Sequence, residues 1–161
     1  MAHLRTAGAG DGEAIVAIFQ SARAAALAYL PILHTDAEDR AFFGRLVATG
    51  ATTVAVEDDL PLGFIVLGAN SVEHLYVAPG AWRRGIGSLL LRDAQARRPG
   101  GLGLWVFQRN RAAIAFYESH AFTITETTTG AGNEEGEPDA RMVWPGAPTV
   151  GDRAYDDPIT S

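Results

Sequence analysis

A basic segment with two glycines follows a short β-branched and aromatic run near the middle of the chain. Arg83 and Arg84 precede Gly85 and Gly87, and a helical apolar pattern begins at Ile86. Glycine lacks a Cβ, so the loop backbone can turn its N–H groups inward and approach a ligand closely. The free N–H groups of the following helix favour an anion, and guanidinium groups offer forked donors that suit phosphate oxygens. The segment therefore predicts a strand, a pyrophosphate-holding loop and a helix.

Two other kinds of phosphate loop are excluded. A dinucleotide-binding loop would need a third glycine where Leu90 stands, and a P-loop would need Gly-Lys followed by Ser or Thr. The remaining alternative is a plain tight connection between strand and helix, and the two adjacent arginines argue against it.

A second segment can place an amide, a small residue and a phenol on one helical face. Asn110 is a suitable N-cap, and it is followed by Ala113 or Ile114 and then Tyr117 at spacings of three, four and seven residues. The structural alternative for Tyr117 is a core aromatic beside Phe116. The pattern thus predicts a helix that could line a binding site after an aromatic strand.

Together the two segments resemble motifs A and B of the GNAT N-acetyltransferases, most closely the bacterial small-molecule type. In motif A the matching positions are Val77, Pro79, Gly85 and Gly87. Trp82 stands where the family usually has Gln or Arg, and Arg83 stands where Gly is common. In motif B, Ala121 replaces a frequent Gly. The loop backbone can still bind its ligand, although the side-chain contacts of the loop should differ.

The resemblance implies an enzyme that uses acetyl-CoA as cosubstrate and no metal, moving the acetyl group to a primary amine of a small molecule by direct attack. It assigns cofactor binding to Leu75, Tyr76, Val77, Trp82, Arg83, Arg84, Gly85, Ile86, Gly87, Ser88, Asn110, Ala113, Phe116 and Tyr117. Tyr117 would also protonate the departing thiolate, because a phenol of pKa about 10 is a competent acid for a thiol that titrates near 8.5.

Glu73 and His74 are the candidates for the base that removes the amine proton through water. They are adjacent on the strand before the loop, so they point to opposite faces and only one is expected to serve. Glu73 is the first choice. Their structural alternatives are a solvated carboxylate on the sheet face and a histidine hydrogen-bonded beneath a loop.

The acceptor is expected to contact two loops that vary in such a fold. The expected substrate-binding residues are Tyr29, His34, Asn133, Glu134 and Glu135. The acidic residues could attract an ammonium group, and the alternative is a solvated loop. Two other functions stay open, namely a protein or peptide N-acetyltransferase and a non-catalytic acyl-CoA-binding sensor. A closed cleft between Tyr29 and Asn133 would count against a peptide acceptor.

Composition limits the remaining classes of function. The formal charge of −6 argues against non-specific nucleic-acid binding, and the absence of cysteine excludes disulfides and thiolate sites. The four histidines show no metal spacing, and no apolar run is long enough for a signal peptide or a membrane span. We expect a cytoplasmic protein, with no nucleic-acid or membrane partner; homodimers are frequent in the family.

The elements that position these residues predict an α/β single-domain GNAT-like fold over residues 1–144, followed by a tail at 145–161. The expected order is β-α-α-β-β-β-α-β-α-β-β, in a mixed central sheet of about seven strands flanked by about four helices, with a right-handed parallel unit around the phosphate loop. Asp11 is expected to cap the first helix, Thr35 and Glu38 to form a capping box, and Asp58-Asp59 to turn a hairpin.

Overall fold

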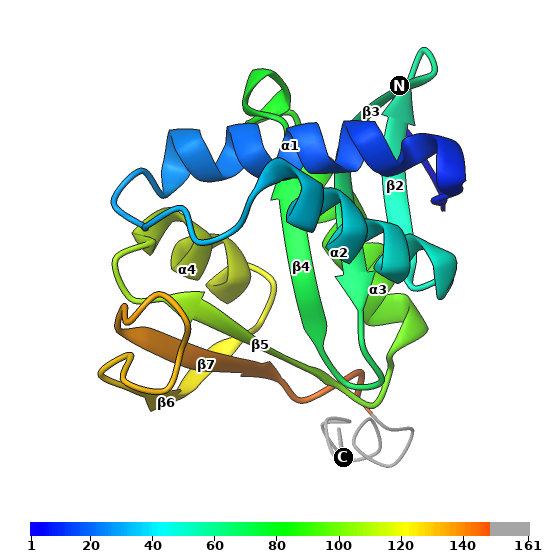
Figure 1. Cartoon of the computed structure of the whole chain (residues 1–161). Helices are drawn as coiled ribbons and strands as arrows, with labels where there is room; N and C mark the ends of the chain where they lie inside the picture. Colours follow the sequence, from blue (N-terminus) through cyan, green and yellow to red (C-terminus); the bar gives the residue numbers. More distant parts are fainter. Residues whose placement is uncertain (149–161) are drawn as a thin grey trace, which may run out of the picture.

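The computed structural model describes residues 1–148, and within them the helices and strands follow the predicted order (Figure 1). The elements are β1 (His3–Thr6), α1 (Gly12–Ala26), α2 (Asp36–Ala48), β2 (Thr52–Glu57), β3 (Leu60–Leu67), β4 (Val72–Val77), α3 (Ile86–Arg97), β5 (Leu102–Phe107), α4 (Arg111–Glu118), β6 (Thr123–Thr127) and β7 (Asp139–Trp144). Short 3-10 turns, η1 (Ala9–Asp11) and η2 (Pro79–Ala81), precede α1 and the loop before α3. Of the predicted tail, residues 149–161 lie outside the described residues.

The predicted α/β fold is confirmed, but its strands form two antiparallel sheets instead of one continuous mixed sheet. The first sheet has the order β1-β2-β3-β4 and the second the order β5-β7-β6. In residues 1–148 a single isolated parallel bridge, Ser71 to Gly103, joins the two sheets. Beyond it, β4 and β5 diverge (Figure 1), because β5 pairs with β7 from Leu102 to Phe107. The divergence opens a space between the sheets.

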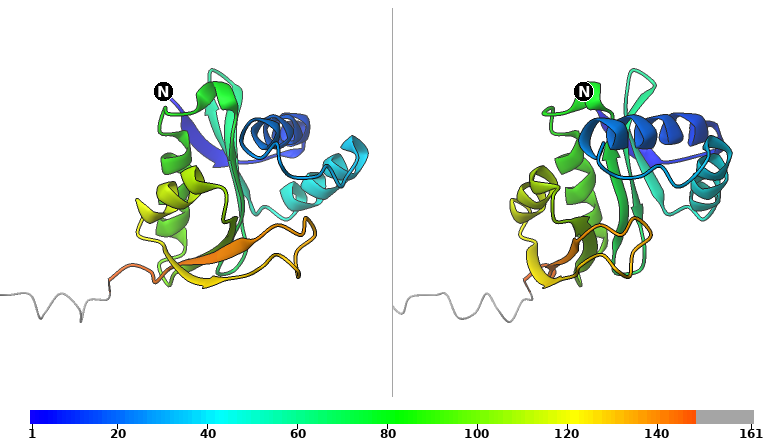
Figure 2. Two further views of the ribbon diagram at one scale, coloured as in Figure 1. Left: turned by 90° about the vertical axis from the view of Figure 1, so that its left-hand side faces the viewer. Right: turned by 60° about the vertical axis from the view of Figure 1, so that its left-hand side comes forward.

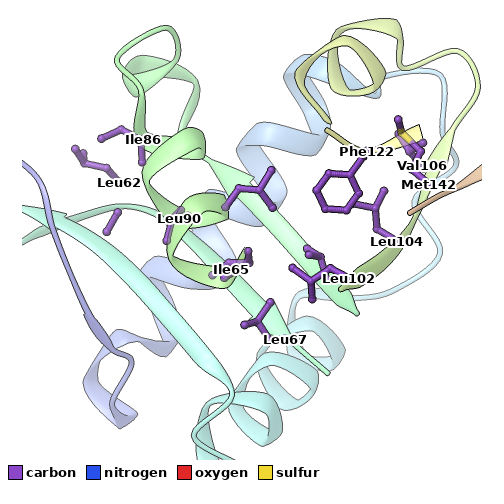
Figure 3. Close-up of a cluster of buried hydrophobic side chains, with 14 of the residues drawn as sticks. Leu62, Ile65, Leu67, Ile86, Leu90, Leu102, Leu104, Val106, Phe122 and Met142 are labelled. Atoms are coloured by element: carbon purple, nitrogen blue, oxygen red, sulfur yellow. The ribbon is translucent and has the colours of Figure 1, made fainter. Parts of the chain in front are cut away.

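The helices cover the sheets from two sides (Figure 2). On one side α1 and α2 bury a cluster around Phe43 and Phe64, which are 2% and 0% exposed. On the other side, α3 and α4 cover a second cluster that includes Leu90, Leu102 and Phe122 and spans both sheets (Figure 3). Side chains from both sheets therefore pack into one shared core.

Local signals set the ends of the helices beside the opening. Thr35 and Glu38 form the predicted capping box, with distances of 3.2 and 3.1 Å between the side-chain and backbone atoms. Asn110 Oδ1 accepts from the Ala113 N–H at 3.2 Å, as its N-cap position predicts. The Asp11 prediction was wrong in its detail: its carboxylate does not cap α1, because it accepts from the Arg5 guanidinium at 2.7 and 2.9 Å.

The predicted hairpin between β2 and β3 turns at Asp58 and Asp59. Both residues have positive φ angles, 50° and 61°. Two consecutive left-handed residues match the right-handed twist of the strands on either side. Aspartate tolerates this conformation better than most residues, so the turn forms without glycine.

Candidate active site

A cavity of about 570 Å³ lies where β4 and β5 diverge, beneath the carboxyl end of α1 and beside the first turns of α3 and α4. It is lined by Ala22, Ala26, Leu27, Leu75, Tyr76, Val77, Ala81, Trp82, Arg83, Gly85, Ile86, Gly87, Ser88, Asn110, Ala112, Ala113, Phe116 and Tyr117. The structure therefore brings together every residue predicted to bind the cofactor except Arg84. We call it the central cavity.

The loop before α3 presents backbone donors to the central cavity. Gly85 has a φ of 78°, a left-handed conformation that glycine adopts without strain. The Leu89 N–H donates to the Gly85 carbonyl at 3.0 Å, so the N–H groups of the preceding turn have no acceptor within the helix. A Cβ on Gly87 would lie 3.3 Å from the Phe116 ring, so its absence lets α3 approach α4 closely. These features suit a bound anion.

The two arginines of the loop have different surroundings. Arg83 has a φ of 64° and lines the central cavity. Arg84 lies outside the cavity and forms an ion pair with Glu57 at the end of β2. This guanidinium lowers the pKa of the Glu57 carboxyl. Of the two predicted phosphate ligands, only Arg83 therefore faces the proposed cosubstrate site.

Trp82, which replaces the usual Gln or Arg, has a structural contact of its own. Its Nε1–H donates to the Val77 carbonyl at 2.8 Å, just beyond the divergence of the strands. The indole is 42% exposed and forms part of the cavity wall. It thus replaces a polar side chain with an aromatic surface and occupies the last carbonyl of β4.

Tyr117 and Tyr76 approach the central cavity from α4 and β4. The Tyr117 ring packs against Phe116 and Phe122 at centroid distances of 5.2 and 5.6 Å. Burial raises the pKa of the Tyr117 hydroxyl, and the nearby Tyr76 raises it further. Burial also raises the pKa of Tyr76, with Arg23 acting in the opposite direction. Both phenols are therefore protonated at neutral pH, and Tyr117 holds a proton beside the cavity.

The two candidate bases differ in environment, and neither lines the central cavity. Glu73 is exposed and accepts a hydrogen bond from Ser71 Oγ at 2.6 Å, near the junction of the sheets. His74 packs edge-on against Phe42 and Phe43, each at 5.4 Å between ring centroids. This burial lowers the pKa of His74, so its imidazole is neutral at physiological pH.

The two loops predicted to bind the acceptor contact each other. His34 Nε2 lies 2.8 Å from a carboxylate oxygen of Glu134, which raises the pKa of the histidine. Beside them, the Arg23 guanidinium on α1 pairs with Glu135 at 3.1 Å. These pairs tie α1 and the segment after it to the loop between β6 and β7.

A third contact holds the same two loops together. The Arg109 guanidinium lies 3.9 Å from the centre of the Tyr29 ring and pairs with Glu137. Asn133 is turned into its own loop, where its amide donates to the Glu137 carbonyl at 2.7 Å and to Asp139 at 3.1 Å. The predicted acceptor residues do not line one common pocket: Asn133 stays within its own loop, and the others form bridges between the loops.

Sequence reasoning missed several residues of the site. Arg23 was not singled out because its partner, Glu135, is more than a hundred residues away in the chain. Ala22 and Ala26 leave space for the central cavity, and their spacing of four residues on one helix face is a signal that could have found them. His120 was also not among the predicted site residues, and its Nε2 lies 3.0 Å from Oγ of Ser88, a predicted cofactor-binding residue at the start of α3. This contact ties the phosphate-loop helix to the end of α4.

Within residues 1–148, no group of three or more potential metal ligands comes together, and no helix combines the length and apolar character of a membrane span.

The sequence and fold match known acetyltransferases. A family model described as an acetyltransferase (GNAT) domain matches residues 48–124. The chain is 36% identical over 105 residues to the peptidyl-lysine N-acetyltransferase YiaC of Escherichia coli, covering 65% of this chain and 70% of that protein. It is 29% identical over 126 residues to the peptidyl-lysine N-acetyltransferase YjaB of Salmonella typhimurium, covering 78% and 86%.

A crystal structure of the PaiA N-acetyltransferase from Thermoplasma acidophilum in complex with coenzyme A shares the fold. Its TM-score is 0.71 at 16% identity, over 89% of this chain and 98% of that one. Fold, cavity and sequence define an acyltransferase enzyme of the α/β class. The chain belongs to the GNAT acetyltransferase family.

Proposed function

We propose that the protein transfers an acetyl group from acetyl-CoA to a primary amine by direct attack. The observation that carries this proposal is the central cavity, which connects the donor-rich start of α3 with the phenol of Tyr117. One end of the cavity suits a pyrophosphate and the other holds a proton donor. The PaiA neighbour, solved with coenzyme A, supports this use of the fold.

The residues of the chain divide the work of binding. Backbone N–H groups of Gly87 and Ser88 are offered to the pyrophosphate, and Arg83 supplies a positive charge beside them. Within residues 1–148, the edge of β4 has no neighbouring strand on the cavity side, and Trp82 occupies the Val77 carbonyl, so the backbone groups of Leu75 and Tyr76 are the ones available to the pantetheine arm. Backbone N–H groups there could polarise the thioester carbonyl.

Proton transfer completes the reaction. The neutral amine attacks the acetyl carbonyl carbon, the carbon–sulfur bond breaks, and the sulfur takes the proton of the Tyr117 hydroxyl. The proton that the new amide nitrogen then loses restores the Tyr117 phenol. Burial raises the pKa of that hydroxyl, and the same low-polarity surroundings disfavour a free thiolate. The Tyr117 phenol and the CoA thiol are therefore both weaker acids than in water, and their pKa values remain matched for the proton transfer.

The proton of the incoming ammonium needs an acceptor, and His74 now has the stronger support. Its pKa is lowered by burial, and its ring is 6.4 Å from that of Tyr76, which lines the central cavity. Glu73 is engaged by Ser71 near the junction of the sheets. We propose that His74 accepts the proton through water, with Glu73 as the alternative.

Two acceptor classes follow from different observations. The bridges from His34 to Glu134 and from Arg23 to Glu135 narrow the approach, which favours a small-molecule amine. The names of YiaC and YjaB favour the lysine side chain of a protein or peptide, whose slender alkyl chain also suits a narrow approach. We retain the small-molecule amine as the first candidate and peptidyl lysine as the second.

A thiol-release assay tests both candidates with acetyl-CoA against free amines and lysine peptides. The chain contains no lysine, so self-acetylation of lysine cannot add to the signal. Release with free amines alone would support the first candidate, and release with peptides alone the second. Calorimetric binding of acetyl-CoA without release from any acceptor would contradict transferase function and support a sensor.

A further inference from the structure

A second cavity, of about 460 Å³, lies on the outer face of the β5-β7-β6 sheet, under the loop between β6 and β7. Its walls include Trp105, Phe107, Thr128, Asn133, Glu135 and Asp139. Trp105 and Phe107 alternate with Leu104 and Val106, whose side chains are buried in the core on the opposite face. Trp105 is 50% exposed. An aromatic surface is thus offered to a ligand.

Of the two carboxylates that line this outer cavity, one is paired with a cationic side chain and the other is not. Glu135 is neutralised by Arg23 at 3.1 Å. Asp139 accepts from the Thr128 hydroxyl and from Asn133 Nδ2, and in residues 1–148 no cationic group lies within ion-pair distance of it. Arg141, the cross-strand partner of Trp105, has its guanidinium against Gly103. The Asp139 carboxylate therefore has neutral partners and a free charge.

The outer cavity is linked to the reaction site through one ion pair. Glu135 lines the outer cavity, and its partner Arg23 is close enough to Tyr76 and His74 to affect the pKa of each. Arg23 also lies over the Phe19 ring, which contacts the Tyr76 ring at 5.1 Å between centroids. Arg23 therefore contacts both Glu135 in the wall of the outer cavity and Phe19, which packs on Tyr76 of the central cavity.

We propose that the outer cavity binds a second positive charge of the acceptor, held between the Trp105 ring and the Asp139 carboxylate. The proposal rests on the proposed acetyl transfer and narrows its substrate to amines that carry a further cationic group. An aromatic face attracts a cation through its quadrupole, and a partly desolvated carboxylate adds a charge-assisted contact. A diamine and a lysine beside another basic residue share this chemistry.

Matched acceptors test the proposal. Cadaverine is compared with pentylamine, and a lysine peptide with a neighbouring arginine is compared with its glutamine counterpart. We expect KM to be about tenfold lower for the dicationic member of at least one pair, with similar kcat, because a cation–π contact and a carboxylate act on binding. The pair that shows the difference identifies the source of the acceptor.

Variants assign the effect to the cavity. Trp105→Leu and Asp139→Asn should each raise KM for the dicationic acceptor about fivefold, and leave KM for the monocationic acceptor and for acetyl-CoA unchanged. Glu126→Gln is the matched control, because Glu126 is an exposed carboxylate on β6 outside the cavity. Trp105→Leu leaves every described hydrogen bond of the loop in place, so it keeps the test valid if Asp139→Asn fails to fold.

Equal KM values within both pairs of acceptors would overturn the proposal, as would a rise in KM that is the same for both members of a pair. If no acceptor supports turnover, the proposed function fails, and the cavity is then tested by binding alone. In that case, titration with cadaverine should shift the NMR signal of the Trp105 indole while pentylamine does not. No selective shift would refute the second-cation site.

Discussion

Replacing Tyr117 by phenylalanine should separate catalysis from binding. The ring packs against Phe116 and Phe122, and the hydroxyl has no hydrogen-bond partner in residues 1–148. Tyr117→Phe therefore keeps the packing, and the free energy of unfolding should change by less than about 1 kcal/mol. Positioned general acids contribute about 10²- to 10⁴-fold, so kcat should fall by that factor, equivalent to about 3–5 kcal/mol of activation free energy.

The assay is thiol release at saturating acetyl-CoA and amine, with acetyl-CoA affinity measured by calorimetry on the same preparations. The affinity should be unchanged. A more acidic leaving thiol needs less help from an acid, so the ratio of wild-type to variant rate should shrink with S-phenyl thioacetate as donor. Ser119→Ala is the matched control, because it removes an exposed hydroxyl at the end of the same helix outside the central cavity, and its kcat should equal that of the wild type.

Two results would refute the reasoning about Tyr117. Unchanged turnover would remove the phenol from the mechanism. A fall in turnover matched by an equal fall in acetyl-CoA affinity would assign Tyr117 to binding.

Further predictions concern the base, the loop and the amino-terminal ion pair. Burial lowers the pKa of His74, so wild-type activity should fall only as the pH drops below the ordinary histidine pKa. His74→Gln should reduce kcat and remove this acid limb from the pH–rate profile. An unchanged acid limb would exclude His74 as the base. Arg83→Glu should weaken acetyl-CoA binding about tenfold in calorimetry, whereas Arg84→Glu should have a much smaller effect, and the reverse order would contradict the placement of the two side chains. Asp11→Ala should lower the free energy of unfolding by about 2 kcal/mol in urea denaturation at neutral pH, because it removes the buried carboxylate that accepts two hydrogen bonds from Arg5. The Arg5 hydrogen bond lowers the pKa of Asp11, so this stabilisation is present above the ordinary aspartate pKa and is lost as the pH falls through the lower pKa of the folded state. An equal difference in unfolding free energy between wild type and variant at neutral pH and at a pH below that folded-state pKa would contradict this reasoning.

Local features of the fold were accessible from the sequence because each depends on neighbouring residues. The Thr35 and Glu38 box, the Asn110 cap and the Asp58-Asp59 turn involve groups within three positions of each other. The same holds for Gly85 and the start of α3. Their hydrogen bonds and backbone angles are set by residue type and spacing, which a single sequence displays.

Features that depend on distant residues were not accessible. The divergence of the sheets depends on β5 pairing with β7. Arg84 turns away from the cavity because Glu57 lies at the end of a strand formed much earlier in the chain. Arg23 faces Glu135 only after α1 has packed on the first sheet. Each depends on a tertiary contact whose partner the local sequence does not indicate.

The departures from the family pattern are explained by the backbone. Arg83 and Ala121 stand where the family often has glycine, and their φ angles are 64° and 68°. The left-handed conformation is therefore kept at both positions, at a cost of about 1 kcal/mol for each residue with a Cβ. At Arg83 the compensation is a charged side chain in the central cavity.

The junction of the two sheets also has a consequence for cooperativity. The first sheet draws on residues 3–77 and the second on residues 102–144, and in residues 1–148 a single isolated bridge links their backbones. Each sheet can therefore act as a separate cooperative unit, coupled to the other mainly through the side chains of the shared core. A ligand that bonds to β4 and contacts α4 would join the two units, so binding should stabilise the protein against unfolding as well as prepare it for reaction.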